Sequence, residues 1–137
     1  MRVKRHINRL RLRAERNKIL RRGMRRQREL TASNDRTGQI EAHHILLFAT
    51  LRNERVRLPY FLKYYRALGV NHFLMVDNGS TDGSAEYLAD QPDVSLWQTD
   101  ESYKQAKFGM DWLNGLLNRF ADGNWAVVVD VDEFLVY

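Results

Sequence analysis

From His44 onward, short apolar runs alternate with segments in which apolar residues recur at helical spacing. The apolar runs predict strands at residues 45–50, 73–76, 94–97 and 125–129. The intervening segments predict helices that begin near Leu58 and that cover residues 85–88 and about 103–120. Runs of Val, Ile and Leu without alternation are typical of parallel strands covered on both faces. The sequence therefore predicts an α/β fold with a mostly parallel sheet and flanking helices, built from consecutive βαβ units. Its core is expected to include Phe108 and the three tryptophans, Trp97, Trp112 and Trp125.

The charge of the chain is divided very unevenly. Residues 1–30 carry 13 lysines and arginines against Glu15 and Glu29, whereas residues 31–137 carry 9 against 15 acids. Helix-forming residues dominate the first segment and proline is absent, which predicts a basic helical extension over residues 1–30, interrupted or weakened near Gly23. Residues 31–43 are polar and turn-rich and are interpreted as a linker. The α/β domain is then expected to span residues 44–137.

Three roles for the basic extension stay open on composition alone. It can lie on an anionic membrane surface, bind nucleic acid by counterion release, or be a solvated extension. Binding to nucleic acid is the least favoured role, because no aromatic residue is interleaved with the charges to stack on bases. No apolar run approaches the length of a membrane span, and no secretory signal is evident. We expect a cytoplasmic location. If the extension binds membrane, the chain would be attached peripherally to the inner face of the membrane.

Acidic residues follow two of the predicted strands. Asp77 comes directly after the second strand, and Asp130 and Asp132 follow the last one. A D-x-D motif alone arises readily by chance in a chain with ten aspartates, so its context must support it. Open α/β sheets bind ligands just outside the carboxyl ends of their strands, and these acids occupy that edge, so the acids of the two strands are expected to converge on one crevice. Since the chain has no cysteine, a metal there would be held by oxygen or imidazole.

The ordered motifs of residues 44–137 resemble a known family. They are Thr-Leu-Arg-Asn-Glu at 50–54, Leu-Pro-Tyr-Phe-Leu at 58–62, Val-Asp-Asn-Gly-Ser-Thr-Asp-Gly at 76–83 and Asp-Val-Asp-Glu-Phe-Leu at 130–135. In this order and spacing they resemble the nucleotide-sugar-binding half of a family 2 glycosyltransferase with the Rossmann-like GT-A fold. The basic extension lies outside the resemblance.

The resemblance implies an enzyme that transfers a sugar from a nucleoside diphosphate donor to a glycan or other acceptor, with inversion, as in polysaccharide biosynthesis. It implies Mg²⁺ or Mn²⁺ on the diphosphate, held by Asp132 with Asp130, which also faces the ribose. The donor-binding residues it implies are Thr50, Asn53, Glu54, Asp77, Asn78 and Asp130, with Asp77 on the base. Relatives commonly carry aspartate where this chain has Asn78, so no charged role is implied there. Because the catalytic base of such enzymes follows the D-x-D, it is expected beyond Tyr137. The 137-residue chain is then expected to carry the donor half and not to turn over alone.

Other interpretations of these residues remain beside the resemblance. Asp82 is more simply a helix cap than a ligand, and Glu133 is more simply structural. Arg52 is expected either to pair with a neighbouring acid or to approach a phosphate. The alternative function is a non-catalytic interaction module that binds anionic membrane or an acidic partner through residues 1–30. A nucleotidyltransferase is disfavoured, because no glycine-rich phosphate loop precedes a helix.

Overall fold

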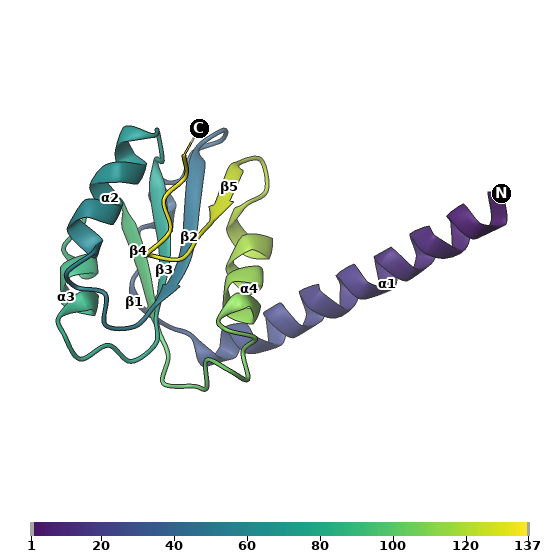
Figure 1. The fold of residues 1–137 in the computed structure, drawn as a ribbon, viewed down its shortest axis with the longest axis horizontal. Helices are drawn as coiled ribbons and strands as arrows, with labels where there is room; N and C mark the ends of the chain where they lie inside the picture. Colours follow the sequence, from purple (N-terminus) through teal and green to yellow (C-terminus); the bar gives the residue numbers. More distant parts are fainter. Residues whose placement is uncertain (1, 137) are drawn as a thin grey trace.

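A five-stranded mixed sheet forms the centre of the molecule (Figure 1). The computed structural model describes residues 2–136, with side chains from Asn8 onward. The strand order is β1-β4-β3-β2-β5. Strands β2 to β5 all run parallel to one another, and β1 runs antiparallel to β4. The bounds are β1 Thr31–Asn34, β2 Ile45–Leu51, β3 His72–Asp77, β4 Val94–Gln98 and β5 Trp125–Val128. The predicted α/β class and mostly parallel sheet are therefore confirmed.

Helices cover both faces of this sheet (Figure 1). Helices α2 (Leu58–Ala67) and α3 (Ser84–Ala89) lie on one face, where Phe61, Leu62 and Leu88 pack on alternate residues of the strands. Helix α4 (Met110–Phe120) covers the other face with Trp112 and Leu116. Both faces of β2 and β3 are consequently buried, which explains their continuous apolar sequences.

The predicted helix over 103–120 begins seven residues later than expected. Lys107, Phe108 and Gly109 all have a left-handed backbone, with φ of 54°, 58° and 79°, and three such residues cannot continue a right-handed helix. A Cβ on Gly109 would lie 2.7 Å from Thr50 Oγ1, so the chain approaches β2 here as only glycine permits. Phe108, predicted in the core, is 65% exposed.

The interpretation of residues 31–43 as a linker is wrong. Residues 31–34 form β1, which pairs with the otherwise free edge of β4, and Thr37–Gln39 form the short 3-10 helix η2. Side chains fix the segment further: Asn34 Nδ2 donates to the Ala89 carbonyl at 2.6 Å, and the Arg36 guanidinium donates to the Val94 and Ala89 carbonyls. This segment belongs to the domain, because it closes one edge of the sheet.

The basic extension is a single helix whose carboxyl end is docked on the domain. Helix α1 (Arg2–Arg26) passes through Gly23 without the interruption that was one of the two predicted outcomes there, and the 3-10 helix η1 (Gln27–Glu29) follows it. Gly23 lies against Gly115 of α4, where a Cβ on Gly23 would come within 2.9 Å of the Gly115 nitrogen. Arg22 Nε donates to the buried Asp111 carboxylate at 2.8 Å, and Trp112 Nε1 donates to Glu29 at 2.9 Å. Residues 20–30 thus form part of the fold, whereas the side chains of residues 8–19 are exposed.

The buried His72 gives the stability of the fold a predictable pH dependence. Burial lowers the pKa of His72 below its usual 6.5, and its Nε2 lies 2.8 Å from Ser95 Oγ. The unfolded chain therefore takes up this proton at a higher pH than the folded chain, and the unfolding free energy is expected to fall as pH drops below about 6.5. Urea unfolding at about pH 7.5 and pH 5.5 measures this, since native carboxylates titrate mainly below that window. The His72→Phe variant should lose the slope, and an unchanged slope in that variant would assign it to other groups.

Candidate functional site

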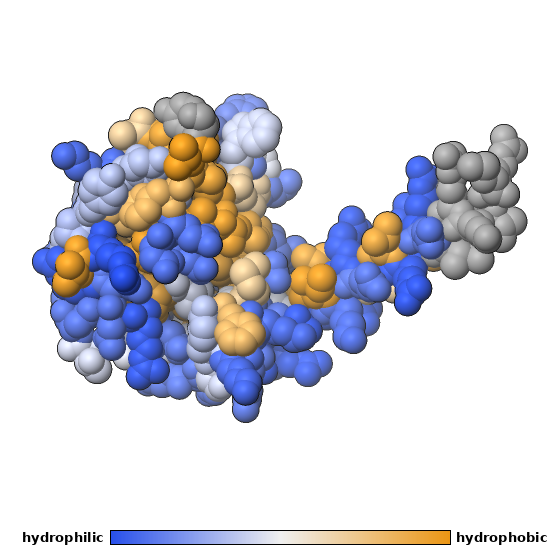
Figure 2. Space-filling view, viewed as in Figure 1, coloured by the Kyte–Doolittle hydropathy of each residue, from blue (hydrophilic) through white to orange (hydrophobic). Residues whose placement is uncertain are grey.

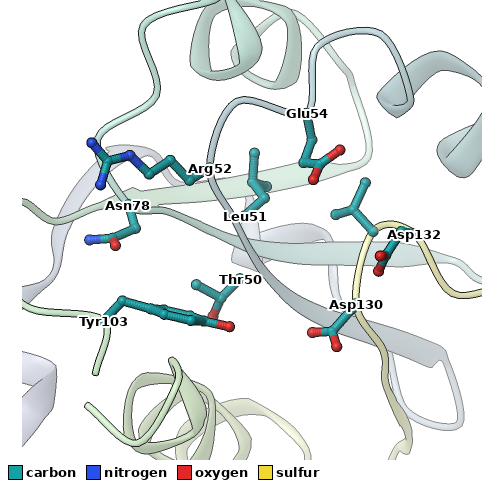
Figure 3. Close-up of a pocket in the computed structure, with 9 residues that line it drawn as sticks. Thr50, Leu51, Arg52, Glu54, Asn78, Tyr103, Asp130 and Asp132 are labelled. Atoms are coloured by element: carbon teal, nitrogen blue, oxygen red, sulfur yellow. The ribbon is translucent and has the colours of Figure 1, made fainter. Parts of the chain in front are cut away.

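A cleft of about 380 Å³ opens at the carboxyl edge of the parallel strands (Figure 3). It lies beyond the ends of β2, β3 and β5, the edge at which open α/β sheets bind ligands. Figure 3 shows the carboxylates of Asp130 and Asp132 on one side and the Tyr103 ring extending toward Asp130 from the other. The lining residues are Thr50, Leu51, Arg52, Glu54, Asn78, Tyr103, Asp130, Val131 and Asp132.

A tight turn after β5 presents the two aspartates. Strand alternation does not orient them, because the strand ends at Val128. Instead, the Glu133 N–H donates to the Asp130 carbonyl at 3.0 Å, and the Glu133 carboxylate accepts from the Asp130 N–H at 3.2 Å. Val131 is buried between them and anchors the turn, while Asp130 and Asp132 are exposed. Glu133 therefore closes the turn, and the two aspartates form no ion pair within the described chain.

Partial burial and neighbouring negative charges disfavour the ionised form of Asp130 in this turn. Desolvation, followed by the neighbouring Glu133 and Asp132 charges, raises the pKa of Asp130 above its usual value. Burial and the charges of Asp130 and Asp132 also raise the pKa of the Tyr103 phenol, which stays a hydrogen-bond donor. A bound cation would relieve the repulsion between these carboxylates. No cluster of three or more His, Asp or Glu side chains suited to a metal occurs among the side chains that the structure describes, those of residues 8–136, so a cation here would need further oxygens from its ligand or from water.

The loops after β2 and β3 are joined by hydrogen bonds. The Asn53 N–H donates to Ser80 Oγ at 2.8 Å, and Asn53 Oδ1 accepts from the Thr81 N–H at 2.8 Å. Asp82 accepts from the Arg55 N–H and from both the N–H and the hydroxyl of Ser84. Asn53, predicted to bind the nucleotide, lies outside the cleft and ties the two loops together. Asp82 has a structural role, but it is not the predicted helix cap, because the N-cap of α3 is Gly83.

Three further predicted residues line the cleft, and their polar atoms differ in whether they already have a partner. Glu54 is held by Arg57 at 2.6 Å, so its carboxylate is already partly neutralised. Thr50 Oγ1 is buried and has no hydrogen-bond partner in the described chain. Asn78 also lines the cleft, but its amide nitrogen donates to the Thr99 and Glu101 carbonyls. Only the amide oxygen of Asn78 is therefore left for a ligand.

Asp77 lies in a neighbouring hollow. Its side chain is 1% exposed; Oδ2 accepts from the Ser80 N–H at 3.2 Å, and Oδ1 has no partner in the described chain. Strand β2 separates β3 from β5. Asp77 and Asp130 therefore line different hollows, contrary to the prediction that they converge on one crevice. This second hollow is lined by Glu29, Thr31, Asp77, Gly79, Ser80, Gln98, Thr99, Asp100 and Glu101.

A third hollow connects the other two. It shares Arg52, Asn78 and Tyr103 with the first and Gly79, Asp100 and Glu101 with the second, and it adds Ser102 and Lys104. The predicted crevice is thus a groove along the carboxyl edge, with acids at both ends. The cations that line it are Arg52 and Lys104, both in its middle, and Arg52 forms no ion pair with any described acid. Of the two roles weighed for Arg52, this geometry favours the approach to an anionic ligand.

Tyr103 is a site residue that the sequence analysis missed, because it was assigned to the start of a helix. The signal for it was available: Tyr103 follows the end of β4, and the carboxyl ends of parallel strands lie at the same edge. Comparison of the chain with protein-family models, curated proteins and solved structures gives no match. The interpretation of the groove therefore rests on its geometry and chemistry.

Proposed function

We propose that this chain binds the donor of a metal-dependent glycosyltransferase of the GT-A type, a nucleoside diphosphate sugar whose sugar passes to a glycan or other acceptor. The observation that carries the proposal is the groove at the carboxyl edge. Two exposed aspartates stand at one end, a buried aspartate with an unpartnered oxygen lies at the other, and two cations lie between. The ordered motifs of residues 50–135 support the same assignment.

The chemical character of the groove matches the parts of such a donor. Asp77 Oδ1 would accept an N–H from the base, and Arg52 and Lys104 would lie along the diphosphate. Asp77 and the end of β5 are two strand spacings apart, about 10 Å, which suits a ligand extended across the sheet edge. Tyr103 is placed to donate a hydrogen bond beside the Asp130 carboxylate.

Asp130 and Asp132 would hold Mg²⁺ or Mn²⁺. Mg²⁺ commonly takes only one or two protein carboxylates and completes its shell with phosphate and water oxygens, which fits a site with two exposed aspartates. A bound cation supplies charge stabilisation to the departing diphosphate. The described residues then bind and orient the donor: the turn at Asp130–Glu133 fixes the carboxylates, and the loop carrying Tyr103 forms the opposite wall.

Calorimetric titration with UDP and GDP, in the presence of Mn²⁺ and in EDTA, tests the proposal. We expect at least one of these nucleotides to bind about tenfold or more tightly with Mn²⁺, because the cation joins the aspartates to the diphosphate. UMP and GMP are the matched controls, since they keep the base and ribose but lack the diphosphate, and Mn²⁺ should change their affinity little. The proposal is contradicted if neither UDP nor GDP binds more tightly with Mn²⁺ than in EDTA.

A further inference from the structure

The amino-terminal part of α1 is an exposed cationic arm. Figures 1 and 2 show it projecting from the domain with a mostly hydrophilic surface and isolated apolar side chains. Its ion pair between Arg11 and Glu15 spans 4.0 Å at the exposed surface, and such pairs contribute little. Along the whole of α1, including its docked end, six other cations are exposed and form no ion pair with a described acid: Arg9, Arg13, Arg16, Lys18, Arg21 and Arg25. Like charges four residues apart, as at Arg9 and Arg13, destabilise an isolated helix.

The cations are arranged in two flanks around the helix. At 100° per residue, Arg9, Arg13 and Arg16 lie on one flank, and Arg11, Lys18, Arg21 and Arg25 lie on the opposite one. Between the flanks, Leu10, Asn17 and Met24 follow one another at intervals of seven residues and form a narrow strip. Leu10 and Met24 are 54% and 58% exposed.

We infer that α1 is a docking surface for an anionic lipid bilayer, with the strip of Leu10, Asn17 and Met24 facing the membrane. In that orientation the two side chains enter the headgroup region, while the cations of both flanks reach up to lipid phosphates along their aliphatic stems. A bilayer with anionic headgroups meets both flanks at once. The binding is mainly electrostatic, since the strip holds only two large apolar residues and Asn17 interrupts it.

The docked end of α1 makes this arm a fixed part of the molecule. Gly23 packs on Gly115, and Arg22 pairs with the buried Asp111, so the helix direction is set by the domain. Nucleic acid is the less suitable polyanion, because the strip between the flanks presents Leu and Met where base recognition needs hydrogen-bonding or stacking groups. The inference is independent of the proposed donor site.

Flotation of the full chain with vesicles tests the inference. We expect binding to vesicles of phosphatidylcholine mixed with phosphatidylglycerol, little binding to phosphatidylcholine alone, and release as NaCl is raised, because salt screens the attraction. Combining Arg9→Gln, Arg13→Gln and Arg16→Gln should lower the partition coefficient about a hundredfold, since each cation near the surface contributes a few-fold.

The orientation is tested by two matched double variants. Leu10→Gln with Met24→Gln, on the strip, should weaken binding about tenfold. Leu12→Gln with Ile19→Gln, on the other side of the helix and similarly exposed, should leave binding nearly unchanged. Circular dichroism of each variant verifies that α1 is intact. Equal losses in the two pairs, equal binding to neutral vesicles, or displacement of the vesicles by duplex DNA or RNA at similar charge concentration would overturn the inference.

Discussion

Asp132→Asn is expected to weaken Mn²⁺-dependent binding of the preferred nucleoside diphosphate about a hundredfold, the order of effect for removing a charged ligand group. The substitution keeps the shape of the side chain but removes its negative charge. Since Asp132 is exposed and sits in a turn held by backbone atoms and Glu133, the fold should be unaffected. The measurement is calorimetric titration of UDP and GDP with Mn²⁺, accompanied by thermal denaturation of the variant.

Asp122→Asn is the matched control for this variant. Asp122 is also an exposed aspartate of the same domain, but it follows α4 and lines none of the three hollows. Its substitution changes the net charge by the same amount, and nucleotide affinity should stay within about twofold of the original, as expected for a distant screened charge. If the Asp132 and Asp122 variants bind alike, Asp132 does not hold the cation.

The second large effect is expected where α1 crosses α4. Gly115→Ala should destabilise the fold by about 2 kcal/mol, because overpacking outweighs the roughly 1 kcal/mol that alanine gains over glycine inside a helix. A Cβ at this position would lie 2.4 Å from Gln27 Cγ and 2.8 Å from the Gly23 carbonyl oxygen. The side chain of Gln27 can move aside, but the backbone of α1 must shift as a whole. Urea unfolding followed by tryptophan fluorescence measures both the loss of stability and the change around Trp112.

Gly38→Ala provides the comparison for the crossing variant. A Cβ on Gly38 meets no heavy atom within 4 Å, so this substitution should change the unfolding free energy by less than about 0.5 kcal/mol.

The Gly115→Ala variant should also become cleavable by trypsin near η1, since displacing α1 exposes its arginine-rich junction. A Gly115→Ala variant as stable as Gly38→Ala would mean that α1 is not closely packed on the domain.

The strands at the centre of the sheet were predictable because burial on both faces requires continuous apolar sequence. That requirement is met by β2 and β3. The polar Thr-Ala-Ser-Asn of β1 carries no such signal, since its extended state comes from pairing with β4. Trp125, predicted in the core, is 73% exposed because β5 lies at the edge of the sheet. Such effects depend on the order of the strands in the sheet, and the local pattern of apolar and polar residues carries no information about that order.

The candidate site was predictable in its location and less so in its detail. Parallel strands share one carboxyl edge, and the sequence placed Asp77, Asp130 and Asp132 there correctly. It did not reveal that β2 lies between the two acidic ends. The left-handed turn at residues 107–109 also ends a helical pattern that would otherwise have run to Tyr103. The roles of these residues with a nucleotide or a metal stay predictions.

Glu29 belongs to two parts of the molecule at once. It pairs with Arg26 at 2.6 Å and accepts from Trp112 at the root of α1, and it also lines the hollow that contains Asp77. If attachment of α1 to a surface moves Glu29 and so changes the affinity of that hollow for its ligand, ligand binding must change the affinity of α1 for the surface by the same factor. Surface attachment and nucleotide binding would then be thermodynamically linked: a bound nucleotide would change the free energy of attachment by the same amount as attachment changes the free energy of nucleotide binding.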